Sequence, residues 1–210
     1  MNWEHAVLVF GALLVSLTVH EAMHAWAAMR GGDLTAYRTG QVTLNPLPHI
    51  QREPFGMVVL PLLSLLATNG QSCIGFAHAP YDPIWAARHP RRAALMSAAG
   101  PLGNVLLAAI AFGVLWFAGL PYSMDNASPL QQMAIVFLYL NLLLAVFNLI
   151  PLPPLDGAGV VRGLAPATGR FFDAIAAVPY SALVVFLLAS RYLGEALDPL
   201  LTAVLRLLPY

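Results

Sequence analysis

The stretch AVLVFGALLVSLTVHEAMHAWAAM, residues 6–29, is apolar and long enough to cross a bilayer as a helix, yet it contains two histidines and an acid. Polar groups of this kind are costly inside a membrane and mark functional sites there. His20 and His24 lie four residues apart on one helix face, so both imidazoles can bind one zinc ion. Glu21 is then close enough to polarise a zinc-bound water. An accidental match, or polar residues that only join helices by hydrogen bonds, is the alternative.

The composition is that of an integral membrane protein. Of the 210 residues, 59% are hydrophobic and 10% are charged, whereas soluble domains carry about 25% charged residues. The formal net charge is zero and the basic residues are spread out, so we expect no nucleic-acid partner. The single cysteine, Cys73, excludes an internal disulfide and a cysteine-cluster metal site. The N-terminus lacks the basic residues of a secretory signal, so we expect the first span to stay in the mature protein.

Three apolar stretches, 6–29, 93–120 and 130–150, are predicted to cross the membrane. Residues 171–190 are long enough to be a fourth span, kinked at Pro179, and 196–208 are predicted to form an amphipathic helix against the bundle or in the interface. Residues 55–68 are too short for a full crossing and are predicted to be re-entrant. The expected fold is an all-α polytopic membrane protein with about four transmembrane helices. It forms a single domain over 1–210, with a core at 5–165 and accessory helices at 171–208.

The placement of arginines predicts the orientation in the membrane. The loop 119–129 contains no basic residue, so the positive-inside rule places it outside. With 55–68 re-entrant, the arginines that flank the spans are all cytoplasmic, and Asp156 comes to the same side as the cytoplasmic half of the first span. We expect a multi-pass protein of a bacterial or archaeal cell membrane, with a site reached from the cytoplasm. The flanking arginines are Arg30, Arg38, Arg52, Arg88, Arg91, Arg92, Arg162 and Arg170.

Residues 35–44, TAYRTGQVTL, contain alternating β-forming residues interrupted by Gly40 and ended by Asn45-Pro46. This pattern predicts a short β-hairpin or edge strand near the cytoplasmic face. An ordinary polar loop is the alternative, because ten residues carry a weak signal.

Asp156 is the acid most suited to join the two histidines. A catalytic zinc usually keeps three protein ligands and one open position. In NLIPLPPLDG, residues 148–157, three prolines break a hydrophobic helix just before Asp156 and Gly157. Such a break is tolerated at membrane depth only against protein or a wet cavity, and an acid there is a candidate functional residue. Asp156 as the N-cap of a helix beginning near Gly157 is the alternative.

Polar and small residues elsewhere have structural interpretations. We expect Gly100 to permit close helix packing, and Asn104 and Asn141 to join helices by hydrogen bonds. His49 and His78 lie in loops near the proposed site, where a loop hydrogen bond is the expected role.

Four motifs in order resemble those of the site-2 protease family of intramembrane zinc metalloproteases: HEAMH at 20–24, GQVTLNPLPHI at 40–50, AGPLGN at 99–104 and NLIPLPPLDG at 148–157. The resemblance covers most of residues 5–165. It implies that His20, His24 and Asp156 bind one Zn²⁺ per chain and that Glu21 is the catalytic acid/base. It further implies that Asn148 helps to hold the scissile region. We expect the compact form of the family, without a PDZ-like or CBS-like domain.

The expected function is hydrolysis of peptide bonds in or near transmembrane segments, so the expected partners are a transmembrane protein substrate and the lipid bilayer. A helical substrate must unwind locally, and an edge strand around Gly40 and Val42 would pair with the unwound chain. The alternative function is a zinc-binding membrane scaffold without proteolysis, which would not need Glu21 as a base. A small transporter would show paired repeats with broken helices, and the sequence has none. The sequence makes no prediction of the oligomeric state.

Overall fold

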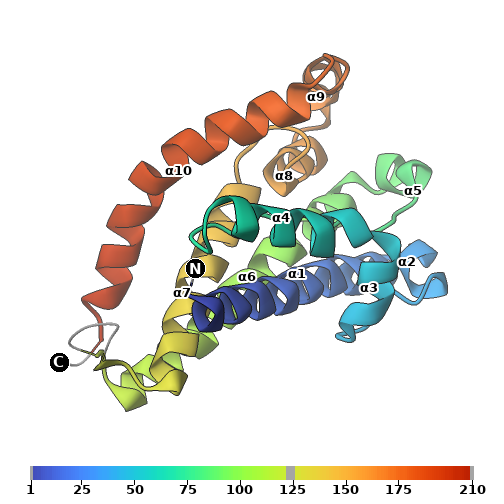
Figure 1. The fold of residues 1–210 in the computed structure, drawn as a ribbon. Helices are drawn as coiled ribbons and strands as arrows, with labels where there is room; N and C mark the ends of the chain where they lie inside the picture. Colours follow the sequence, from blue (N-terminus) through green and yellow to red (C-terminus); the bar gives the residue numbers. More distant parts are fainter. Residues whose placement is uncertain (1, 122–125, 209–210) are drawn as a thin grey trace.

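The computed structural model of the chain describes residues 2–121 and 126–208. Three of its helices are long and apolar enough to cross a membrane: α1 (Trp3–Gly31), α6 (Pro90–Ala118) and α7 (Pro129–Asn148). They pack against one another as a bundle (Figure 1). The three clear spans predicted from the sequence are therefore confirmed. Residues 122–125 of the loop predicted to lie outside the cell are not among the described residues.

The bundle has an apolar outer surface and an inner face of small residues. No hydrophobic effect drives helices together in lipid, so close van der Waals packing through small side chains has to stabilise the bundle. Buried alanines such as Ala12, Ala108 and Ala145 are of this kind. Large apolar side chains point outward instead, where they suit lipid tails. On α6 these are Leu95, Leu102, Leu106, Ile110 and Phe117.

The end of α1 is tied to a distant part of the chain through Asp33. The helix stops at Gly32, whose left-handed φ of 99° suits glycine. Asp33 then accepts hydrogen bonds from the Thr35 backbone and hydroxyl and from the Asp82 backbone N–H. Burial raises the pKa of Asp33, but these hydrogen bonds outweigh it and the pKa is lowered. The contact fixes the start of α5 (Pro83–Arg88) beside α1.

The predicted β-hairpin at 35–44 is wrong. Thr35–Arg38 form the short helix α2, residues 39–44 form turns and bends, and no strand occurs among the described residues. Local hydrogen bonds explain this, because Asp33 starts a helical turn at Thr35, and the Gln41 backbone N–H donates to the Ala36 carbonyl. With no partner strand beside it, the alternating pattern has nothing to pair with.

Residues 55–68 are helical but do not form a straight span. The helix α3 (Pro46–Arg52) precedes a π-helical segment, η1 (Phe55–Val59), which continues into α4 (Leu60–Ala67). The axis of α3 meets the axis of the continuous η1–α4 helix at 111°. The bend lies next to Pro54, which lacks a backbone N–H donor. This geometry fits a broken span or a re-entrant loop, so the predicted re-entrance stays a prediction.

The predicted fourth span at 171–190 is two helices rather than one kinked helix. After a short 3-10 turn, η3 (Pro166–Thr168), α9 (Gly169–Ala176) and α10 (Ser181–Leu205) meet at 101° across a break that contains Pro179. The end of α10 includes most of the helix predicted at 196–208, which is therefore not a separate element. In Figure 1, α10 runs from α9 to the end of the bundle where the chain terminates. By length and composition, the described residues contain three helices that could cross a membrane, or up to five crossing segments if each bent pair is one span.

The chain turns back on itself after α7 and enters α8 (Asp156–Leu164), which packs against α6. Gly157 makes the tight return possible, because a Cβ there would lie 2.2 Å from the Leu149 carbonyl oxygen and 2.5 Å from that of Ile150. The first turn of α8 is thereby directed at the middle of the bundle, where Asp156 reaches α1.

Candidate metal centre

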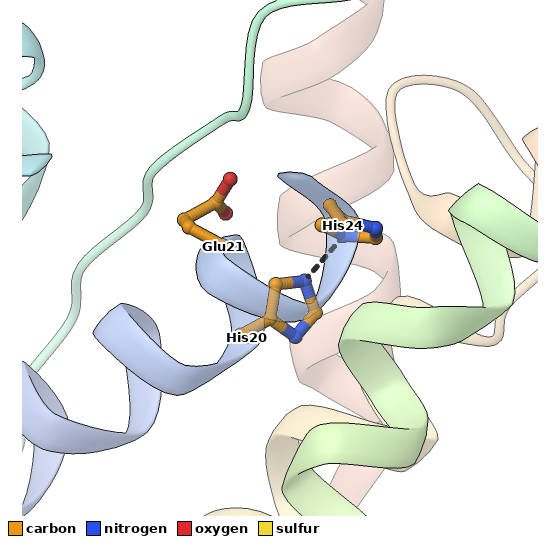
Figure 2. A group of neighbouring side chains, drawn as sticks. All are labelled: His20, Glu21 and His24. Carbon is orange, nitrogen blue, oxygen red and sulfur yellow. Dashed lines mark hydrogen bonds between the residues drawn. The ribbon is translucent and has the colours of Figure 1, made fainter. Parts of the chain in front are cut away.

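Three potential ligand atoms converge between α1 and α8. His20 Nε2 lies 3.0 Å from His24 Nε2, and Asp156 Oδ2 lies 3.1 Å from the first and 3.3 Å from the second. Figure 2 shows the two rings turned toward each other, with Glu21 beside them. The alternative role for Asp156, a helix N-cap, does not fit, because Leu155 is the N-cap of α8 and no side chain caps it.

A chain of hydrogen bonds fixes the tautomer of His20. The Phe137 carbonyl can only accept, so it receives a hydrogen bond from Asn141 Nδ2. Asn141 Oδ1 then accepts from Asn104 Nδ2 at 2.8 Å, which leaves Asn104 Oδ1 facing His20 Nδ1 at 2.6 Å. Nδ1 must therefore carry the proton, and Nε2 of the neutral ring presents a lone pair.

His24 is oriented in the same way by a backbone group. Its Nδ1 donates to the Met96 carbonyl at 2.7 Å, so its Nε2 is also an acceptor. The centre thus brings two imidazole lone pairs and a carboxylate together. Asp156 Oδ2 and Glu21 Oε2 are buried and have no hydrogen-bond partner among the described residues. A buried cluster of acceptors is unfavourable unless a cation balances it.

The spacing and chemistry of this cluster fit zinc. Bonds of about 2.0–2.1 Å in a tetrahedral arrangement place the ligand atoms roughly 3.3 Å apart, close to the 3.0–3.3 Å found here. Nitrogen and carboxylate oxygen are both ordinary zinc ligands, and three protein ligands leave a fourth position for water. The His20, His24 and Asp156 set therefore fits a catalytic rather than a purely structural zinc site.

Glu21 is placed to act on a water molecule at this centre. Its side chain is buried, with 2% of its surface exposed, and ligand atoms of Glu21, His20 and His24 lie within 4.8 Å of one another. The free carboxylate oxygen makes no protein contact that would compete for a proton. A carboxylate in this position can serve as a general base.

Gly100 on α6 leaves the space that the ligand atoms occupy. A Cβ at Gly100 would lie 2.3 Å from His24 Nε2 and 2.6 Å from His20 Nε2. Gly100 and Asn104 are four residues apart and share one helix face, so AGPLGN presents this space and the orienting amide to α1 together. The sequence interpretation of both residues as helix contacts is correct, but it misses what they do for the histidines. Their four-residue spacing was the available signal.

A cavity of about 330 Å³ opens onto the centre. Asn148 lines it, as expected for a substrate-binding residue, and its Nδ2 donates one hydrogen bond to the Leu144 carbonyl. Gly40 and Val42 do not line this cavity, so the structure does not bring these two predicted residues to the site. The sequence did not predict several lining residues, which come from the extended segment 71–82, α6, α8 and α9: Ala77, Ala79, Tyr81, Ser97, Gly159, Arg162 and Phe172.

The two histidines predicted to lie in loops are hydrogen-bonded as expected, but His49 lies on helix α3 and not in a loop. His49 Nε2 lies 2.9 Å from the Thr43 carbonyl oxygen. His78 Nδ1 lies 2.8 Å from a carboxylate oxygen of Glu53, and His78 also lines the cavity. Neither histidine belongs to the group of His20, Glu21 and His24 that could hold a metal ion.

Replacing Asn104 with leucine is expected to lower zinc affinity by about 10–100-fold, the usual effect of removing a group that orients a metal-binding histidine. The reason is that His20 Nδ1 loses its acceptor while the branched shape of the side chain is kept. Competition with a zinc chelator measures the affinity. Asn141→Leu is the matched control, because it perturbs the same buried network while Asn104 Nδ2 keeps the Ser16 carbonyl as an acceptor and so keeps its Oδ1 toward His20. An equal loss in both variants would assign Asn104 to packing.

Comparison with known proteins gives a consistent family likeness. A family model described as "Peptidase family M50" matches residues 123–190, a range that includes Asn148 and Asp156 but not His20. The chain is 38% identical over 160 residues to "Putative zinc metalloprotease YwhC" of Bacillus subtilis (strain 168), which covers 73% of this chain and 67% of that protein. No solved structure matches the chain.

Two mycobacterial proteins show a similar likeness. "Putative zinc metalloprotease Rip2" of Mycolicibacterium smegmatis is 34% identical over 177 residues, covering 77% of this chain and 62% of that protein. The protein of the same name from Mycobacterium tuberculosis (strain ATCC 25618 / H37Rv) is 35% identical over 183 residues, which cover 86% of this chain and 65% of that protein. The chain thus spans about two thirds of the length of the relatives it matches.

Proposed function

Because the chain belongs to peptidase family M50, the site-2 protease family, we propose that it is a zinc metalloendopeptidase that hydrolyses peptide bonds in or near transmembrane segments of membrane proteins. The observation that carries this proposal is the convergence of two imidazole lone pairs and the Asp156 carboxylate beside an unpaired Glu21. This cluster lies on a helix apolar enough to cross the membrane.

Each residue of the centre has a separate role in the proposal. His20, His24 and Asp156 hold one zinc ion per chain. When bound, zinc supplies a Lewis acid for the scissile carbonyl and lowers the pKa of its water toward about 7. Glu21 accepts a proton from the attacking water and then donates it to the leaving amine, as a general base and a general acid in turn.

Asn148 is proposed to hold the substrate at the scissile bond. It lines the same cavity as Glu21, and its Nδ2 has one hydrogen engaged with its own helix. The second hydrogen and the amide oxygen remain for the substrate backbone or for the oxyanion that develops on the carbonyl. The role thus needs no rearrangement of α7.

Access from the cytoplasm is supported by the position of the centre in α1. His24 lies seven residues before Gly31, the last residue of the helix, or about 10 Å along the helix axis. Arg30 lies in the last turn of α1, and Arg91 and Arg92 lie in the first turn of α6, which packs beside it. The positive-inside rule assigns this end to the cytoplasm.

The test of this function is reconstitution of the purified chain with a model transmembrane substrate. We expect about one zinc per chain, as for a single catalytic site. Cleavage should stop when a chelator removes the metal and return when zinc is added. Mass spectrometry of the products locates the cut. Bound zinc without cleavage across a panel of substrates would favour a zinc-binding scaffold, and cuts confined to soluble regions would contradict intramembrane hydrolysis.

A further inference from the structure

Arg162 is the one residue with a permanent positive charge among the described residues that line the cavity. It lies on α8, six residues after the proposed ligand Asp156, which is about 9 Å along the helix axis. An extended peptide rises about 3.3 Å per residue. A substrate that runs along α8 from the centre would therefore pass Arg162 about two or three residues from its scissile bond.

The guanidinium of Arg162 is only partly used by the protein. Its Nη2 donates to Asp173 Oδ1 and, at 3.3 Å, to the Gly169 carbonyl, both from the α9 region. Its Nε and Nη1 groups donate to no protein atom in the described structure. A guanidinium offers five N–H groups in a planar fork that matches a carboxylate. Arg162 can thus receive a second carboxylate without losing Asp173.

The surroundings of Arg162 favour binding of a second carboxylate. Its ion pair with Asp173 is open to water, with 48% and 68% of the two side chains exposed, and exposed ion pairs contribute little to stability. Apolar side chains also line the cavity, including the buried Phe172 and the partly buried Leu155. Attraction between charges is stronger where such groups exclude water.

We propose that Arg162 forms a carboxylate-binding subsite, which selects substrates with a carboxylate about two or three residues from the scissile bond. The inference rests on the proposed function and adds the substrate class to it. The carboxylate is either an acidic side chain or the free C-terminus of a substrate that has already been cut. Asp173 binds Nη2 of the guanidinium, which leaves the Nε and Nη1 side for the substrate carboxylate.

A binding assay tests the subsite without relying on cleavage. It measures the affinity of fluorescent peptides for zinc-loaded Glu21→Gln protein, which is not expected to cleave them. The peptides share one apolar sequence and carry aspartate, alanine or lysine on either side of its centre. A parallel pair ends in a free carboxylate or an amide. We expect the aspartate or free-carboxylate peptide to bind about tenfold more tightly than its neutral partner, as for one charge-assisted hydrogen bond. The arm that shows the preference identifies the source of the carboxylate.

Substitutions assign the preference to Arg162. In the Glu21→Gln background, Arg162→Gln should remove the preference for the acidic peptide. Arg162→Glu should reverse it, so that the lysine peptide binds more tightly. Arg170→Gln is the matched control, because Arg170 is an exposed arginine on α9 that does not line the cavity, and it should keep the preference. Equal dissociation constants for acidic and neutral peptides, or a preference that survives Arg162→Gln, overturn the subsite. Cleavage of the neutral substrate by the wild type, measured alongside, reports on the proposed function separately.

Discussion

Glu21→Gln is expected to lower kcat/KM for a transmembrane substrate by about 1,000-fold or more while the zinc content stays at the wild-type level. Glutamine keeps the size of the side chain but cannot accept a proton, and general acid–base groups contribute about 10²–10⁴-fold. Zinc should be retained because the three converging ligand atoms come from other residues. Metal analysis and a gel-based cleavage assay on one preparation measure both quantities.

The control for this variant is Glu4→Gln, an equally conservative change in the exposed first turn of the same helix, which should leave both quantities unchanged. Cleavage that persists in Glu21→Gln would remove Glu21 from the mechanism. Loss of zinc would instead make Glu21 a ligand, which its unpaired oxygen near the histidines also makes geometrically accessible. The two measurements therefore distinguish a base from a ligand.

The membrane spans could be predicted because length and hydropathy are properties of a single segment. Residues 6–29, 93–120 and 130–150 needed no knowledge of their neighbours. The hairpin at 35–44 failed because a strand exists only where a partner lies beside it, and here Asp33 and Gln41 stabilise local turns instead. The break between α9 and α10 was expected only as a kink at Pro179, since proline predicts an interruption but not its angle.

The candidate site also contains residues that the sequence predicts and residues whose roles depend on tertiary packing. The pairing of His20 with His24 follows from helix periodicity alone, and Asp156 was marked by an acid placed at a proline break. The roles of Gly100 and Asn104 depend on how α6 is rotated against α1, which no pattern within α6 specifies. Arg162 was interpreted only as a marker of topology, because its place in the cavity depends on the return of the chain at Gly157.

Gly100→Ala is expected to abolish stable zinc binding, with affinity lowered by more than about 100-fold, a larger effect than that of removing a group that orients a ligand. The added methyl group would lie 2.3 Å from His24 Nε2 and 2.6 Å from His20 Nε2, so it fills the point where the ligand atoms meet. Relief would require α6 to move away from α1, against the close packing of the bundle. Zinc per chain after chelator competition measures the loss.

Alanine substitutions at two other glycines of α6 test whether any such change in this helix lowers zinc affinity. Gly113→Ala meets no atom within 4 Å, and Gly103→Ala meets Met23 Cγ at 2.9 Å, a flexible side chain that can move. Both should bind zinc as the wild type does. Alanine is the better helix former by about 1 kcal/mol, but its Cβ clashes with both histidines, so metal-free Gly100→Ala should melt at or below the metal-free wild type. Wild-type zinc affinity in Gly100→Ala would mean that the metal is not held between these two histidines, because no rotamer of an alanine can move its Cβ out of their way.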